Sequence, residues 1–243
     1  MSNTISVAPL PLHAAARCVR REGERMGLPM VAACANISSA RPAVDEQGVP
    51  LPLVLTDDAA GHPYWSEPDF ALDNGVIAVI RDRADPFFFD EGRIGGWGEM
   101  SLDPQLEARL RRDTYGFSSA IIVPVRLPRS VIGAVVWASN ARHDDIAGLF
   151  ERRADSLLGM AVRLMLHCQD DARSLHAYRL TRREVQCLKL MSAGKTDGEI
   201  ATIMDIARPT VRFHLKNAGA KLGEQGRLRI VQRAVSLGYI GID

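Results

Sequence analysis

The chain has 243 residues, which is enough for one large domain or two modest ones. Hydrophobic residues make up 47% of it and charged residues 24%, and the longest apolar run, 131–138, is far shorter than the roughly 20 residues of a membrane helix, which excludes a membrane-spanning chain. The net charge of +1 conceals 11 Lys/Arg against 6 Asp/Glu in residues 180–243 and 19 against 23 before them, so either only the carboxy-terminal part meets a polyanion or the surface charge is randomly uneven.

Residues 1–168 alternate between patterns typical of helices and of strands. Strands are predicted where Val and Ile are frequent, and the last two strands flank Pro128-Arg129-Ser130, which indicates a hairpin. Broad apolar faces predict helices elsewhere. The expected helices cover 7–28, 104–115 and 142–168, and the expected strands 51–55, 75–81, 119–127 and 131–139. The pattern predicts an α/β sandwich sensor domain of the PAS or GAF kind, an antiparallel sheet with helices on both faces.

A polar, non-periodic stretch, 169–178, is the expected linker to a domain at 179–243. That domain opens with two capping boxes, in which a threonine and a glutamate three residues later satisfy amides of the first helical turn. Thr181 with Glu184 predicts a helix over 181–192 that stops at Gly194, and Thr196 with Glu199 predicts a short helix over 197–204.

A third helix is expected from Pro209. Proline fits the first turn of a helix, because amides there have no partner within the helix and its missing amide hydrogen costs nothing. One side of this helix is apolar through Val211, Leu215, Ala218 and Leu222, and the other presents Arg212, Phe213, Lys216 and Asn217. A fourth helix over 228–237 completes a small core. Two short helices joined by a tight turn, the second with a basic exposed face, are the arrangement of a helix-turn-helix DNA-binding domain.

The strings LTRREVQCLKLMSAGKTDGEIA and TVRFHLKNAGAKLG, followed by RAVSLGYI, resemble the four-helix DNA-binding domain of LuxR-type regulators. The family's motif positions correspond to Glu184, Leu188, Gly194, Glu199, Ile200, Ala201, Thr210, Val211, His214, Lys221 and Leu222. The resemblance implies that the third helix enters the major groove of double-stranded DNA with Arg212, Phe213 and Lys216 toward base edges. It places near phosphates Lys195, Thr196, Arg208, Thr210, His214 and Lys221. Ala207 stands where the family has Ser or Thr, so a hydroxyl cap worth ~1 kcal/mol is missing.

The stretches DNGVIAVIRDRADPFFFD and YGFSSAIIVPVRL resemble the autoinducer-binding domain of quorum-sensing LuxR-type proteins. In that family a pocket holds an acyl-homoserine lactone by an aspartate, a tyrosine and tryptophans; Asp73 matches the aspartate and Tyr64 the tyrosine. One tryptophan position falls on Ala60, Asn74 stands in place of a proline, and Phe88 stands at another aromatic position that is usually tryptophan, so ordinary lactone binding is not expected. A pocket for a different ligand could be lined by Tyr64, Trp65, Asp73, Phe87, Phe88, Phe89 and Trp97. The alternative is that these residues are ordinary core and lid aromatics.

The sequence carries no motif typical of a metal site or of an enzyme active site. The four cysteines show no C-x-x-C pair, the six histidines form no metal-binding motif, and there is no nucleophile elbow, phosphate-binding loop or paired carboxylate. The acidic cluster of phosphorylated receivers is absent from the amino-terminal half. No enzyme activity, cofactor or metal is therefore expected, and the absence of a basic residue before Arg17 argues for the cytoplasm over secretion.

The sequence thus predicts a transcriptional regulator that binds specific DNA through its carboxy-terminal domain and senses a ligand or partner through residues 1–168. A homodimer is expected, because one recognition helix reads few base pairs; the expected contact surfaces are 142–168 and 228–237. The alternative is an interaction protein that forms heterodimers with another regulator and blocks it.

Overall fold

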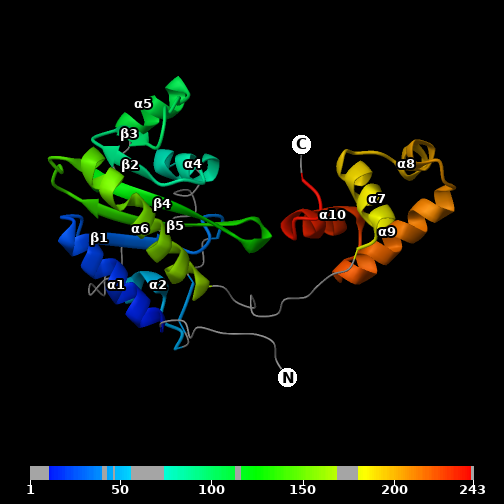
Figure 1. Ribbon diagram of the computed structural model, residues 1–243, viewed down its shortest axis with the longest axis horizontal. Coiled ribbons are helices and arrows are strands. Elements are labelled where there is room, and N and C mark those ends of the chain that lie inside the picture. The colour runs from blue at the N-terminus through cyan, green and yellow to red at the C-terminus, as the bar shows by residue number, and fades with distance from the viewer. Residues whose placement is uncertain are drawn as a thin grey trace. The chain divides into compact units, whose positions relative to one another are not determined.

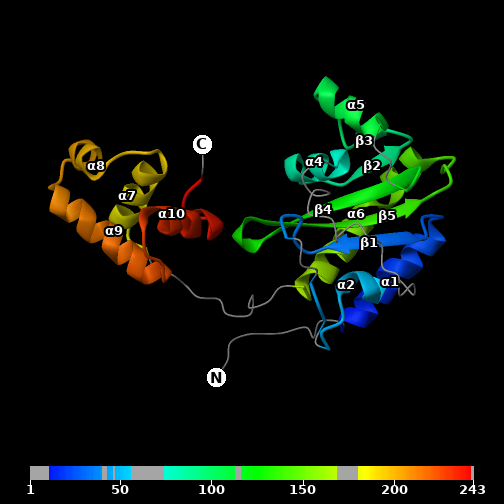
Figure 2. The same cartoon turned by 180° about the vertical axis from the view of Figure 1, so that it is seen from behind.

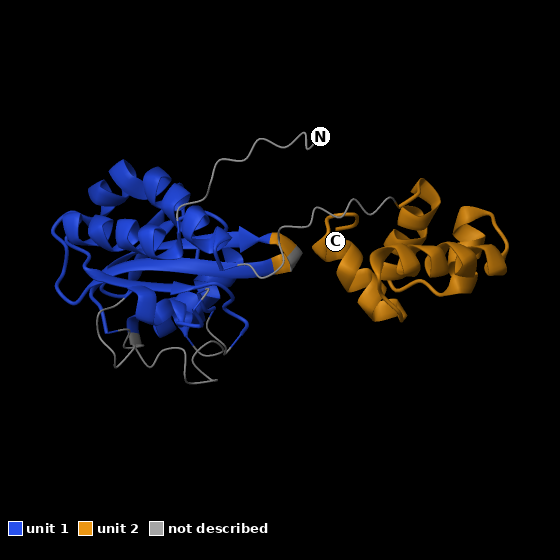
Figure 3. Ribbon diagram, turned by 90° about the horizontal axis from the view of Figure 1, so that it is seen from below, with its two compact units in different colours: residues 1–127, 131–170 blue, residues 128–130, 171–243 orange. Residues whose placement is uncertain are grey.

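The computed structural model describes residues 11–39, 43–45, 47–55, 74–112, 116–168 and 180–241. The chain divides into two compact units, an amino-terminal unit of residues 1–127 and 131–170 and a carboxy-terminal unit of residues 128–130 and 171–243 (Figure 3). The predicted linker, 169–178, lies outside the described residues. Among the residues described, no helix is long and apolar enough to cross a membrane.

The amino-terminal unit is built on an antiparallel five-stranded sheet with the order β1-β5-β4-β2-β3. The predicted hairpin is confirmed: β4 and β5 pair from Ser119 opposite Ser139 to Leu127 opposite Val131, and a short 3-10 turn joins them. The strands are β1 (Met30–Cys34), β2 (Phe87–Asp90), β3 (Arg93–Gly96), β4 (Ser119–Leu127) and β5 (Val131–Ser139). The sequence analysis missed β1, β2 and β3, because strands of four or five residues carry too little alternation to be recognised.

Helices cover both faces of this sheet, as predicted. On one face α1 (Leu12–Arg25), α2 (Leu51–Leu55) and α6 (Ile146–Leu166) share a core with residues such as Ile121 and Trp137. On the other face α4 (Gly75–Asp82) and α5 (Pro104–Arg112) pack on the side chains that alternate with them. In Figure 1 α4 and α5 lie above β4 and β5, and α1 and α2 lie below β1; Figure 2 shows the same layers from behind.

Two predicted strands are wrong, because 51–55 and 75–81 are helical. In α2, Leu51 and Leu55 are buried one helical turn apart, and Pro52 sits in the first turn, where it is tolerated, although it could not donate to a sheet. In α4 the Asn74 side chain accepts a hydrogen bond from the Ile77 amide and caps the helix. Short apolar runs bury equally well as either element, so sequence periodicity could not separate them.

The carboxy-terminal unit is a bundle of four helices around one apolar core. The helices are α7 (Arg182–Ser192), α8 (Asp197–Met204), α9 (Arg208–Leu222) and α10 (Arg227–Ser236), within one residue of the predicted bounds. Isolated helices this short are marginal in water, so the apolar core that the four helices share supplies most of their stability. The predicted fold class, a sheet-and-helix unit followed by a small helical one, is confirmed.

Candidate nucleic-acid interface

The first two helices of the bundle begin as predicted. The Thr181 hydroxyl accepts from the Glu184 amide and the Glu184 carboxylate accepts from the Thr181 amide; Thr196 and Glu199 make the same reciprocal pair. Gly194, which has a φ of 79°, supports the predicted stop after α7, because a left-handed backbone favours glycine. These caps fix where α7 and α8 start, and so fix the frame that carries α9.

An ion pair between a buried glutamate and a partly exposed lysine ties α9 to α7. Lys221 Nζ lies 2.8 Å from both Glu184 carboxylate oxygens, and the Glu184 side chain is only 3% exposed. Burial raises the pKa of Glu184, but the hydrogen bonds from Lys221 and Thr181 outweigh it, so the pKa lies below its ordinary value. The carboxylate therefore stays charged at neutral pH, and the pair anchors the end of α9 that is distant from Arg208.

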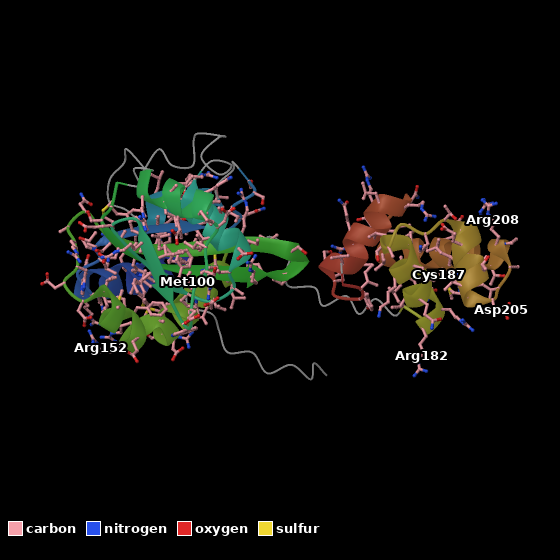
Figure 4. All side chains as sticks on the ribbon, turned by 90° about the horizontal axis from the view of Figure 1, so that it is seen from above. Met100, Arg152, Arg182, Cys187, Asp205 and Arg208 are labelled. Carbon is pink, nitrogen blue, oxygen red and sulfur yellow. The ribbon has the colours of Figure 1, made fainter. Side chains whose placement is uncertain are left out.

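The turn between α8 and α9 sets the position of the recognition helix. Asp205 ends α8 in the left-handed conformation with a φ of 51°, and the chain reaches Arg208 through Ile206 and Ala207. Figure 4 labels Asp205 and Arg208 at this turn and shows the Arg208 side chain pointing away from the bundle. Because the turn is short, α8 and α9 pack directly on each other and leave the outer side of α9 open.

The start of α9 lacks a side-chain cap, as Ala207 predicted. Ala207 already has the extended backbone of a capping residue, with a φ of −68° and a ψ of 143°, but no hydroxyl. Its carbonyl accepts from the Thr210 amide at 2.8 Å. Unsatisfied amides and the positive end of the helix dipole favour an anion at this position.

The outer side of α9 is basic and open to solvent. Val211, Leu215 and Ala218 are buried, whereas Arg212 and Lys216 are exposed one turn apart on another face. Phe213 is 61% exposed, which is unusual for a ring that could have packed in the core. This face brings together Arg208, Arg212, Phe213 and Lys216 from the predicted set.

The other predicted contact residues lie around this face with less exposure. Lys195, Thr210 and His214 are half-buried, and Thr196 is the exposed cap of α8. Lys221 differs from the rest, because its ammonium already pairs with Glu184 and lies three turns of helix beyond Arg208–Val211. The arrangement groups all but Lys221 about the first half of α9 and the start of α8.

Asp197, in the first turn of α8, is a residue that the sequence analysis missed. Its Oδ2 accepts from Arg212 Nε at 3.2 Å, and its Oδ1 accepts from Arg227 of α10. Burial alone would raise the pKa of Asp197, but the hydrogen bonds and charges of the two arginines have the larger effect, so the pKa lies below its ordinary value. No sequence signal could have found this contact, because its members are far apart in the chain and on three different helices.

The predicted ligand residues are only partly described. Tyr64, Trp65 and Asp73 lie outside the described residues. The Phe88 and Trp97 rings both meet Phe150 of α6, at centroid distances of 5.4 and 5.8 Å. Phe87 and Phe89 point to the opposite face of the sheet and are buried in the core under α4 and α5.

The Phe88 ring is held by a close approach to the neighbouring strand. It lies against Gly95, its partner in β3, where a Cβ would come within 2.3 Å of the ring. Trp97 remains 43% exposed at the edge of this cluster. The rings of Phe88 and Trp97 thus pack at tilted angles of 54° on the buried ring of Phe150, and Trp97 keeps part of its surface open to solvent.

Comparison with known proteins identifies the carboxy-terminal unit. A family model described as bacterial regulatory proteins, luxR family (GerE), matches residues 178–234. The chain is 42% identical over 123 residues to the quorum sensing-dependent transcriptional regulator VjbR of Brucella abortus, covering 49% of this chain and 47% of VjbR. It is 48% identical over 61 residues to the transcriptional activator VanR of Vibrio anguillarum, 25% of each chain. The chain thus spans about half the length of VjbR and about a quarter of the length of VanR.

A solved structure resembles the whole fold. The crystal structure of SdiA from Escherichia coli matches with a TM-score of 0.53 at 15% identity, covering 96% of this chain and 93% of SdiA. SdiA in complex with octanoyl-rac-glycerol matches with a TM-score of 0.51 at the same identity, covering 94% of this chain and 89% of SdiA. At this identity the likeness concerns the fold. It agrees with a sheet-and-helix unit followed by a small helical unit.

Proposed function

Since residues 178–234 form a LuxR-family DNA-binding domain, we propose that the chain is a transcriptional regulator that reads specific DNA sequences with α9 in the major groove. The observation that carries this proposal is the basic, solvent-open face of α9 opposite its buried side. The relatives VjbR and VanR are named as a transcriptional regulator and a transcriptional activator, which supports the same conclusion.

In the proposed complex, Arg212, Phe213 and Lys216 face base edges, because they lie on the outer side of α9. An arginine can donate two hydrogen bonds to guanine, and an exposed ring can contact a thymine methyl group. Phosphates would meet the residues at the start of α8 and α9: Lys195, Thr196, Arg208, Thr210 and His214. Lys221 would contribute a phosphate contact only through the part of its ammonium that Glu184 leaves open.

The decisive experiment selects binding sites for the purified chain from random duplexes and then titrates the selected site with salt. We expect one enriched site, a linear fall of log affinity with log salt, and relaxed base preference in Arg212→Ala. Failure to enrich any site, with or without candidate ligands, would contradict autonomous DNA reading. It would favour the heterodimer-forming inhibitor instead.

The DNA-bound form is proposed to be a homodimer in the cytoplasm, where the chromosome is accessible. One recognition helix reads few base pairs, and two copies on a two-fold symmetric site double the contacts. Both helices expected to contact the second copy carry exposed apolar residues, which supports a homodimer. These residues are Val162 and Leu166 on α6 and Leu228 on α10. A selected site without two-fold symmetry, together with a monomeric mass in solution, would contradict this part of the proposal.

The amino-terminal unit is proposed to sense a small molecule with an apolar tail and not an ordinary acyl-homoserine lactone. Its fold is that of SdiA, whose structure is known in complex with octanoyl-rac-glycerol. Support comes from Phe88 and Trp97, whose rings pack on the buried Phe150 and leave Trp97 partly open to solvent as an aromatic contact for such a tail. Titration followed by tryptophan fluorescence tests the proposal: we expect a saturable change with octanoyl-rac-glycerol and none with an octanoyl-homoserine lactone. No change with the glycerol compound, or a saturable change with the lactone, would contradict it for these ligands.

A further inference from the structure

The carboxylate of Asp197 lies between two arginines from different helices. One oxygen accepts from Nε of Arg212 on α9 at 3.2 Å, and the other accepts from Nη1 of Arg227 on α10. The Asp197 side chain is 18% exposed, whereas the two arginine side chains are 64% and 51% exposed. The shielded carboxylate is thus the fixed member of the group, and the arginines extend from it toward solvent.

Arg227 in turn holds the carboxylate in place. Its Nη2 donates to the Lys195 carbonyl at 2.8 Å while Nη1 donates to Asp197, so the guanidinium bridges the backbone before α8 and the side chain in its first turn. A carboxylate in the first turn of a helix is also stabilised by the helix dipole. Both effects favour one orientation of the Asp197 side chain.

The contact leaves the recognition end of Arg212 available. A guanidinium has five N–H donors, and among the described residues Arg212 donates to a protein acceptor only from Nε. Its two Nη groups, which together can donate to O6 and N7 of guanine, have no protein acceptor among the described residues. Holding Nε therefore restricts the rotation of the planar group without blocking its base-reading side.

Asp197 also places a negative charge where DNA phosphates would approach. A carboxylate beside the interface weakens contact with any duplex, because the phosphate attraction is independent of sequence. A fixed Arg212, by contrast, strengthens only the site with guanine in the correct position. The two effects act in opposite directions on non-specific and specific binding.

Resting on the function proposed above, we propose that Asp197 is a positioning residue that orients the Arg212 guanidinium for a base contact, and thereby raises sequence preference while lowering non-specific affinity. Arg227 supports it from α10. Neither residue needs to touch DNA for this role.

The test compares full-length variants on the selected site, on the same site with the preferred guanine replaced, and on unrelated duplex. We expect Asp197→Asn to reduce the preference for that guanine by about tenfold, part of the full value of a bidentate contact, and to raise affinity for unrelated duplex. The matched control is Asp205→Asn, which removes the same charge from the other end of α8, where asparagine tolerates the left-handed backbone. It should change the preference less than twofold.

A double-variant cycle separates positioning from general damage. In the Arg212→Ala background, Asp197→Asn should have no further effect on guanine preference, because its action passes through Arg212. Arg227→Gln serves as a second variant, with a smaller loss of preference, if Asp197→Asn disturbs folding by circular dichroism. Unchanged preference in Asp197→Asn and Arg227→Gln, while Arg212→Ala abolishes it, would overturn the inference and leave the proposed function intact. Absence of any selected site for the wild type would overturn both.

Discussion

The Glu184–Lys221 ion pair joins α7 to α9. Replacing Lys221 by Met keeps the apolar stem but leaves a buried carboxylate without its cation. We expect a loss of ~1–3 kcal/mol in the free energy of unfolding, moderated because the lysine side chain is partly exposed. Amide hydrogen exchange in α7 and α9 measures it. Lys189→Met, on the exposed side of α7, is the matched control and should leave exchange unchanged.

The same carboxylate gives the domain a defined response to acid. The pKa of Glu184 is lowered in the folded state, so its contribution to stability is present above the ordinary value of about 4.3 and is lost as the pH falls through the folded pKa. Urea unfolding at a series of pH values should show a falling free energy below about pH 4.3, and Glu184→Gln should flatten that dependence. An identical slope in both proteins would assign the acid sensitivity to other carboxylates.

The missing cap of α9 gives a prediction of the opposite sign. Ala207→Ser supplies a hydroxyl to the amides of the first turn at a residue whose backbone already has the extended conformation. We expect a gain of ~0.5–1 kcal/mol, toward the lower end for a cap, because the second helical residue is Pro209 and the Thr210 amide already has a partner. The urea midpoint checks this. Ala193→Ser, an exposed change elsewhere, should not raise it.

At the element scale, helix α4 is capped in part by a residue of a distant strand. Arg126 of β4 donates from Nη2 to the carbonyls of Ile80, Arg81 and Arg83, at 3.3, 2.9 and 2.6 Å, and so satisfies the carboxyl end of the helix. Asn74 satisfies the amino end. The apolar run between them predicted a strand, and the helix follows from caps that lie partly on a distant strand.

Arg126→Met should therefore loosen the last turn of α4. We expect a cost of ~1–2 kcal/mol, the value of hydrogen bonds to a charged donor in a largely exposed setting, with faster amide exchange confined to residues 80–83. Arg126→Lys should recover part of the protection, because a lysine can reach one carbonyl at a time. Unchanged exchange in Arg126→Met would show that packing alone holds the helix.

At the scale of the whole molecule, the two units have separate cores. Leu157 of α6 lies in the amino-terminal core and Leu188 of α7 in the carboxy-terminal one, and both are fully buried. All three tryptophans of the chain, Trp65, Trp97 and Trp137, precede residue 170, so tryptophan fluorescence follows only the amino-terminal unit.

This separation predicts independent unfolding. Leu157→Ala should lower the stability seen by tryptophan fluorescence by ~2–5 kcal/mol, the usual effect of a buried cavity, and leave amide exchange in α7 to α10 unchanged. Leu188→Ala should do the reverse. A shift of both signals by either substitution would mean that the two units unfold together.

The sequence by itself determined the carboxy-terminal domain almost completely. Its helices are bounded by local signals, the two capping boxes, Gly194 and Pro209, and the apolar spacing of α9 identified its open face. Local signals suffice there because α7 and α8 begin at capping boxes whose two members are three residues apart, and Pro209 marks the first turn of α9. The hairpin of β4 and β5 was predictable for the same reason, since both strands are long and adjacent in the chain.

Tertiary structure alone decided the features that depend on distant partners. The conformation of 75–81 depended on Arg126, the short strands β1 to β3 on pairing across the sheet, and the environment of Arg212 on Asp197 and Arg227. A short segment has too few residues to fix its conformation by its own pattern, so the free energy of contacts made elsewhere in the chain selects it. The same holds for the cluster of Asp197, Arg212 and Arg227, because its members meet only when three helices have packed.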